Sequence, residues 1–307
     1  MTDRLFGWMP LHRRSDAMLA AHDEALKAMP RFEIKGRQRY GKAVLLYDWS
    51  KAANGGKHLD CFRQETGSCV GQGGGKAIWT LAGVQAVKLG ELISMTLPFY
   101  LVTYGKSREL CGMRGKGDGS TGSGFARAAK EFGVPPSDLE GLPKPTMSDG
   151  LCFGRGVEMA FSHTSAIDRK WFDAAKPHIV RTVANVKTAD EVRDAVVNGY
   201  PCTIASMWGG KMKCPVEDGL LMNQRSTSWP HQMCVLAWQE HDKHGEVFYI
   251  QNSWGPGVHG VCPSGAPPGG FWVRKRDMDG IAREGDSFAF SAFQGFPAQD
   301  MELDWYV

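Results

Sequence analysis

Residues 247–255 read VFYIQNSWG, and this short stretch decides how the rest of the chain is interpreted. Its aromatic and β-branched start predicts a strand over residues 247–251, with Asn252 directly after its end. A second predicted strand, residues 233–238, begins shortly after His231. A carboxamide can accept a hydrogen bond from one imidazole nitrogen, which leaves the other nitrogen able to take a proton. We therefore predict that His231 is a base, that Asn252 orients it, and that Trp254 covers the bond between them.

A thiol that could use this base lies far upstream, at Cys69. It precedes a predicted buried helix, residues 76–84. The thiolate form of cysteine is favoured at a helix N-terminus and beside a histidinium. Three glycines, residues 73–75, either delay the start of this helix or allow another part of the chain to approach closely. Gln64 could donate a side-chain N–H to a developing oxyanion, with the backbone N–H of Cys69 as the second donor.

The chain resembles the papain-like (C1) cysteine peptidases over roughly residues 45–280, through the order Gln64, Gly67-Ser68-Cys69, His231 and Asn252-Ser253-Trp254-Gly255. The resemblance implies an α+β, papain-like two-lobe fold. A helical left lobe and an antiparallel β-barrel-like right lobe would have the active site in the cleft between them. It also implies a thiol protease, a hydrolase that cleaves peptide bonds through a thioester on Cys69, with no cofactor.

The same resemblance suggests where a substrate would bind. Asp118, Gly119 and Ser120 resemble the strand-like edge that hydrogen-bonds a substrate's backbone, although a solvated turn is the alternative. Three features depart from the family. Gln64 is one residue closer to the cysteine than the family's glutamine, Val70 replaces an aromatic residue, and the family's inhibitory propeptide motif is not found in residues 1–60.

Three regions are expected along the chain: an N-terminal extension (1–45), a papain-like peptidase domain (46–280), and a C-terminal strand with an acidic tail (281–307). The first half is rich in helix patterns and the second in strand patterns, which independently predicts an α+β protein. A helix from Ser15 to Met29 either packs on the main body or belongs to a propeptide or docking arm. The tail either adds a strand or serves to dock a partner or block the chain's own site, so a larger assembly through either end is possible.

Composition narrows the class of protein. The formal net charge is only +3, from 36 basic and 33 acidic residues, so a dedicated nucleic-acid binder is not expected. We find neither a secretory signal nor an apolar run long enough to span a membrane, which favours a cytoplasmic or virion-associated protein. Its eight cysteines are irregularly spaced and are expected to be mostly buried thiols. His259 and Cys262 are spaced like metal ligands, but no second pair lies nearby, so no metal is expected.

Two other functions remain open at this stage. The same site could cleave the peptide stems of cell walls, or transfer acyl groups, instead of cleaving general peptide or protein substrates. Alternatively, the chain could be a catalytically weak or inactive papain-like component of an assembly such as a virion. The glycine triplet, Val70 and the shifted Gln64 motivate this second alternative.

Overall fold

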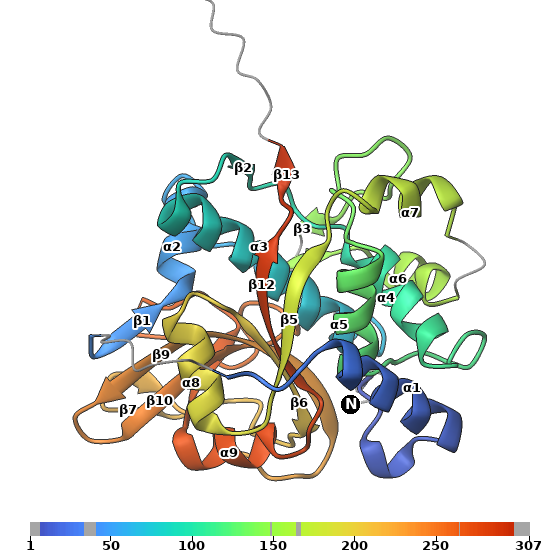
Figure 1. Ribbon diagram of the computed structural model, residues 1–307. Coiled ribbons are helices and arrows are strands. Elements are labelled where there is room, and N and C mark those ends of the chain that lie inside the picture. Colours follow the sequence, from blue (N-terminus) through green and yellow to red (C-terminus); the bar gives the residue numbers. More distant parts are fainter. Residues whose placement is uncertain (1–6, 34–40, 148, 164–166, 264, 298–307) are drawn as a thin grey trace, which may run out of the picture.

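The computed structural model describes residues 7–33, 41–147, 149–163, 167–263 and 265–297 (Figure 1). Its helices are η2 (Leu11–Arg13), α1 (Asp16–Ala28), α2 (Leu46–Ala53), α3 (Cys69–Leu89), α4 (Tyr100–Leu110), α5 (Gly122–Glu131), α6 (Arg155–Ser162), α7 (Arg169–Ala175), α8 (Ala189–Val197) and α9 (Lys275–Ala282). Most of them precede residue 180, and the longest strands follow it, which confirms the predicted α+β class.

The main sheet joins strands from both ends of the chain. Its order is β11-β10-β9-β6-β12-β5, with β1 also paired to β9, and every pairing is antiparallel. These strands are β1 (Ala43–Leu45), β5 (Val180–Val186), β6 (Cys202–Met207), β9 (Pro230–His241), β10 (Gly245–Gln251), β11 (Gly270–Arg274) and β12 (Ser287–Phe293). Short two-stranded ladders complete the described strands: β2 (Ile93–Ser94) with β13 (Phe296–Pro297), β3 (Thr146–Met147) with β4 (Leu151–Cys152), and β7 (Val216–Glu217) with β8 (Leu220–Leu221).

The predicted C-terminal strand is confirmed, but the predicted barrel-like form of the sheet is not. The C-terminal aromatic segment forms β12, as expected, whereas the tail's acidic end, residues 300–307, lies outside the described residues. Within the described chain the sheet is open, because its outer strands β11 and β5 do not pair with each other. The barrel-like form of the strand-rich part and the two-lobe arrangement therefore stay predictions.

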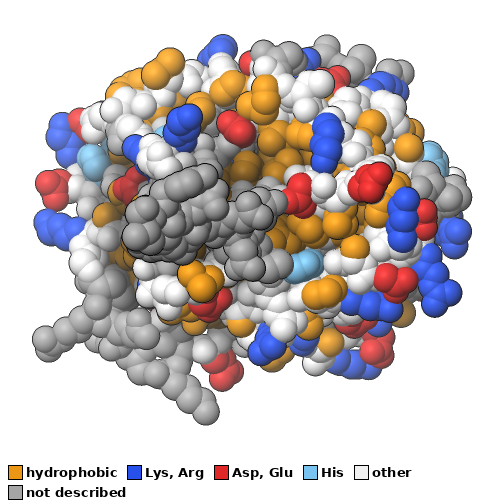
Figure 2. Space-filling view, turned by 90° about the horizontal axis from the view of Figure 1, so that it is seen from above, with side chains coloured by type: hydrophobic (Ala, Val, Ile, Leu, Met, Phe, Trp, Pro, Cys, Tyr) orange, Lys and Arg blue, Asp and Glu red, His pale blue; other side chains and the backbone are white. Residues whose placement is uncertain are grey.

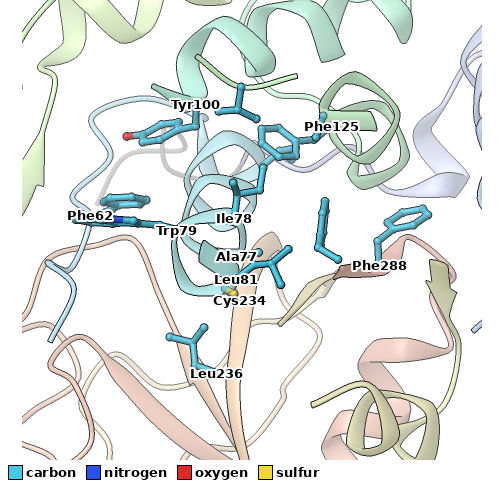
Figure 3. Close-up of a cluster of buried hydrophobic side chains, with 14 of the residues drawn as sticks. Phe62, Ala77, Ile78, Trp79, Leu81, Tyr100, Phe125, Cys234, Leu236 and Phe288 are labelled. Carbon is cyan, nitrogen blue, oxygen red and sulfur yellow. The ribbon is translucent and has the colours of Figure 1, made fainter. Parts of the chain in front are cut away.

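Helix α3 lies at the centre of the molecule, with α4–α7 gathered on one side and the main sheet on the other (Figure 1). Figure 3 shows its side chains Ala77, Ile78 and Leu81 between the aromatic rings of α4 and α5 and the β9 residues Cys234 and Leu236. This helix is buried over residues 69–85. Burial on nearly all sides explains why the sequence shows no polar face there.

The glycine triplet allows this close packing. A Cβ on Gly74 would lie 2.0 Å from the Phe125 ring, and one on Gly75 would lie 2.5 Å from the Tyr100 ring. The prediction that the glycine triplet allows close approach of another segment is thus correct. The alternative prediction, that it delays the start of the helix, is wrong, because α3 begins at Cys69. The cost of about 1 kcal/mol per helical glycine is offset by burial of the two aromatic rings.

The outer surface carries a hollow beside the C-terminal part of this helix. It has a volume of about 710 Å³ and is lined by Gln85 of α3, by His178 and by residues of β2, β12 and β13. Figure 2 shows the molecule from above, where hydrophobic side chains gather near the middle of this face. Among the described residues, no helix is both long and apolar enough to cross a membrane.

Candidate active site

The loop that leads into α3 is held by two carboxylates from outside it. Glu158 of α6 is fully buried and accepts hydrogen bonds from the backbone N–H groups of Glu65 and Thr66, at 3.0 Å each, and from the Ser68 hydroxyl at 2.8 Å. Asp118 accepts from the backbone N–H of Gly67 at 2.6 Å. These bonds fix the turn that places Cys69 at the first position of the helix.

His231 and Asn252 meet where β9 begins and β10 ends. Their side chains approach to 2.7 Å, between Nε2 of His231 and Oδ1 of Asn252. Nδ1 of His231 has no hydrogen-bond partner among the described residues, so its lone pair or proton is not committed to any of them. The ring of Trp254 lies against the imidazole, with a centroid distance of 4.6 Å. Burial lowers the pKa of His231 to about 4.

Cys69 lies against the beginning of β9. The backbone N–H of Gln232, the residue after His231, is directed at its sulfur and favours the thiolate. Burial nevertheless raises the pKa of the Cys69 thiol to about 11, and its side chain is wholly shielded from solvent. With a thiol pKa near 11 and an imidazole pKa near 4, both groups are neutral at physiological pH in this conformation.

A segment of the N-terminal extension covers this sulfur. We call residues 7–14 the strap. The backbone N–H groups of Gly7 and Trp8 are directed at the Cys69 sulfur. The Gly7 carbonyl accepts from the N–H of Ser120 at 2.7 Å, and the N–H of Met9 donates to the Ser120 carbonyl at 2.9 Å. Gly7 is so close to Gly67 that an added Cβ would lie 1.5 Å from the Gly67 carbonyl oxygen.

A buried carboxylate anchors the strap. Nε1 of Trp8 donates to Asp286 at 2.6 Å, and the Arg14 guanidinium forms an ion pair with the same carboxylate. Asp286 also accepts from the backbone N–H groups of Gly122 and Ser123, at 2.7 Å each, at the start of α5. Although burial opposes it, Arg14 and these donors keep the pKa of Asp286 below its ordinary value. The helix predicted at residues 15–29 is α1, which packs on α5 beside this anchor.

The remaining predicted residues lie around the same loop. Gln64 accepts from the Ser253 hydroxyl at 2.5 Å and donates to the Thr66 carbonyl at 2.7 Å. Ser120 is fully buried, so the alternative of a solvated turn is wrong for this residue. Gly119 has a φ of +95° and faces Gly7, where an added Cβ would lie 2.8 Å from the Gly7 carbonyl oxygen.

Sequence reasoning missed three contributors to this region: Glu158, the strap anchored on Asp286, and His259. The last was considered only as a zinc ligand, but its Nε2 lies 2.9 Å from Nδ2 of Asn252. Nothing in the spacing of these residues marks them, because each acts on a partner 7 to 278 positions away in the chain. All eight cysteines, which all lie in the described ranges, are free thiols, and six of them are buried.

Comparisons with known proteins rest on structure alone, since no family model and no curated protein matches the sequence. The chain is similar to xylellain, a cysteine protease from Xylella fastidiosa, with a TM-score of 0.61, 14% identity and coverage of 95% of this chain and 98% of that one.

Two proenzymes are also similar to it. The proform of Amb a 11, a cysteine protease and ragweed pollen allergen, gives a TM-score of 0.52 at 12% identity, covering 94% of this chain and 75% of that one. Procathepsin B S9 from Trypanosoma congolense gives 0.56 at 11% identity, covering 94% and 86%. At such low identity the similarity concerns the fold, and on that ground this chain has the fold of the papain-like cysteine proteases.

Proposed function

We propose that this chain is a cysteine-dependent hydrolase of peptide bonds in which Cys69, His231 and Asn252 act together. The hydrogen bond of 2.7 Å between His231 and Asn252 is the observation that carries the proposal. It commits one imidazole nitrogen to the amide and leaves Nδ1 available to a thiol at the N-terminus of a buried helix. The papain-like fold supports the reaction class by analogy.

The proposed reaction conserves protons within the site. Nδ1 of His231 takes the proton of Cys69, and the thiolate attacks the substrate carbonyl carbon to give a tetrahedral oxyanion. Gln64 and the backbone N–H of Cys69 are the proposed donors to that oxyanion. When the carbon–nitrogen bond breaks, His231 returns its proton to the leaving amine. Water then attacks the thioester, giving a proton to His231, and the thiol is restored when the acid leaves.

The closed strap indicates that this activity is latent in the conformation described here. A substrate carbonyl cannot reach a sulfur that is fully buried beneath Gly7 and Trp8. We therefore propose that the strap leaves before catalysis. Its backbone bonds to Ser120 support an extended peptide as the class of substrate, because they show that this edge can pair with a peptide backbone on both its N–H and its carbonyl side.

Cleavage of a fluorogenic peptide library and of casein, with wild-type protein and Cys69→Ala side by side, tests the proposal. We expect cleavage by the wild type after the strap is displaced by low denaturant or proteolysis, and none by the variant. Zymography on cell walls in parallel distinguishes the narrower substrate class. Equal cleavage by Cys69→Ala would exclude Cys69 as the nucleophile.

A further inference from the structure

We propose that His259 is a positioning residue that fixes the orientation of the Asn252 amide and, through it, the tautomer of His231. The inference rests on the proposed function, because it concerns the same site. His259 is not one of the three residues assigned to the reaction, and it contacts Asn252 on the side opposite His231.

The hydrogen bonds of His259 determine which of its nitrogens carries the proton. The side chain is 1% exposed, and Nδ1 lies 2.9 Å from the carbonyl oxygen of Met212. A carbonyl oxygen only accepts, so Nδ1 carries the hydrogen. Burial lowers the pKa of His259 to about 4, and the neutral ring therefore has an accepting lone pair on Nε2. That nitrogen lies 2.9 Å from Nδ2 of Asn252.

This acceptor leaves only one orientation of the Asn252 amide satisfied. The NH₂ group points to His259, and the carbonyl oxygen accepts both from Nε2 of His231 and from the backbone N–H of Ser253, each at 2.7 Å. A flipped amide would place its oxygen against the lone pair of His259 and its NH₂ group against the N–H of Ser253. Both contacts would be mismatched inside a buried site. His231 must therefore carry its hydrogen on Nε2, and Nδ1 is left for the thiol.

The same contacts argue against a metal at His259. Both ring nitrogens already have partners, one on Met212 and one on Asn252. The sulfur of Cys214 lies 3.8 Å from Nδ1, well beyond a zinc–sulfur bond of about 2.3 Å. The geometry is that of a hydrogen-bond acceptor whose orientation is set by the loop around residue 212.

A pair of substitutions separates positioning from simple loop support. In His259→Gln, the longer amide can place an acceptor where Nε2 was, so Asn252 keeps its partner. In His259→Asn, the shorter amide can reach Met212 but not Asn252. Cys214→Ala is the matched control, because it loosens the same loop and leaves the bond to Asn252 intact.

The direct readout is the tautomer of His231, measured by ¹⁵N NMR of the full chain with the strap in place. We expect a single Nε2–H tautomer in wild type, His259→Gln and Cys214→Ala, and a mixture of tautomers in His259→Asn. As a second readout, labelling of Cys69 by a thiol-reactive epoxide at pH 5 to 6 should slow at least tenfold in His259→Asn only.

Two results would overturn the positioning role: a pure Nε2–H tautomer in folded His259→Asn, or loss of that tautomer in His259→Gln and His259→Asn alike. If neither variant folds, the wild-type spectrum decides, since the inference requires a neutral His259 with its hydrogen on Nδ1. The NMR readout needs no catalysis. A wild type that never cleaves peptides would therefore reject the proposed function and leave the tautomer result to be judged separately.

Discussion

Gly7→Ala should open the strap without altering any residue of the proposed reaction. The added methyl carbon would lie 1.5 Å from the carbonyl oxygen of Gly67 and 2.1 Å from its carbon. Ordinary contacts of this kind exceed about 3 Å, so the strap must retreat by about 1.5 Å. The obstacle is backbone on a loop held by Glu158 and Asp118, which cannot easily yield.

The expected size of the effect follows from the cost of overpacking. Forcing an extra methyl into a packed site costs about 1–3 kcal/mol. If that cost falls on the closed strap alone, the population of open strap rises about 5- to 150-fold, at about 1.4 kcal/mol per factor of ten. The hydrogen bond of 2.7 Å from Ser120 to the Gly7 carbonyl would be lost in the same movement.

Alkylation of Cys69 measures this population, because only the open form exposes its sulfur. Iodoacetamide labelling followed by peptide mass spectrometry separates Cys69 from the other seven cysteines. Gly156→Ala is the matched control, since a Cβ there meets nothing within 4 Å. Labelling that rises less than twofold in a folded variant would refute the reasoning. So would an equal rise at the core thiols Cys202 and Cys234, because that would indicate global unfolding.

Three further predictions concern the supports of the site. Asn252→Ala should reduce the rate of Cys69 labelling at mildly acidic pH about tenfold or more in the folded variant, because the imidazole loses its orienting partner; an unchanged rate would argue against that role. Glu158→Gln should lower the free energy of unfolding by about 1–3 kcal/mol in urea titrations, because its NH₂ group would face backbone N–H donors; a neutral effect would contradict the importance of this carboxylate. Lys76→Met should be more stable than wild type at pH 7 by up to about 3 kcal/mol, because burial lowers the pKa of Lys76 from 10.5 to about 8. As pH rises from 8 to 10.5, Lys76 loses its proton in the folded chain before it does in the unfolded chain, so the wild type gains stability. The difference in free energy of unfolding between the variant and the wild type should therefore shrink. A constant difference between pH 7 and pH 10 would show that the buried charge of Lys76 is not its cause.

The sequence predicted best where short-range chemistry and long-range structure agree. The sequence Thr188-Ala189-Asp190-Glu191 has the pattern of a capping box, and Thr188 caps α8 by accepting from the N–H of Glu191. The runs predicted as strands at 233–238 and 247–251 lie within β9 and β10, because apolar and β-branched residues suit a buried sheet. The pairing of His231 with Asn252 follows from this, since both lie at the ends of neighbouring strands.

The features that escaped prediction depend on contacts between distant segments. Asp286 is an ordinary acidic residue in the sequence, and only the fold brings it to Trp8 and Arg14. Gly7 lies in no recognisable turn motif, and it matters because only a residue without a side chain fits beside Gly67. Periodicity and local motifs report on neighbours in the chain, so they cannot reveal a backbone-to-backbone approach of this kind.

Access to the sulfur and its protonation state are coupled by the strap. In the closed form, burial holds Cys69 as a thiol and His231 as a neutral imidazole. Opening admits water, which favours the thiolate beside the imidazolium. That change moves one proton from sulfur to nitrogen and takes none from solvent, so acidity does not drive it through this pair at any pH where both forms hold one proton between the two side chains. Displacement of the strap would instead come from a group that competes for Ser120 or for Asp286, and such a competitor would expose the proposed nucleophile and charge it in the same step.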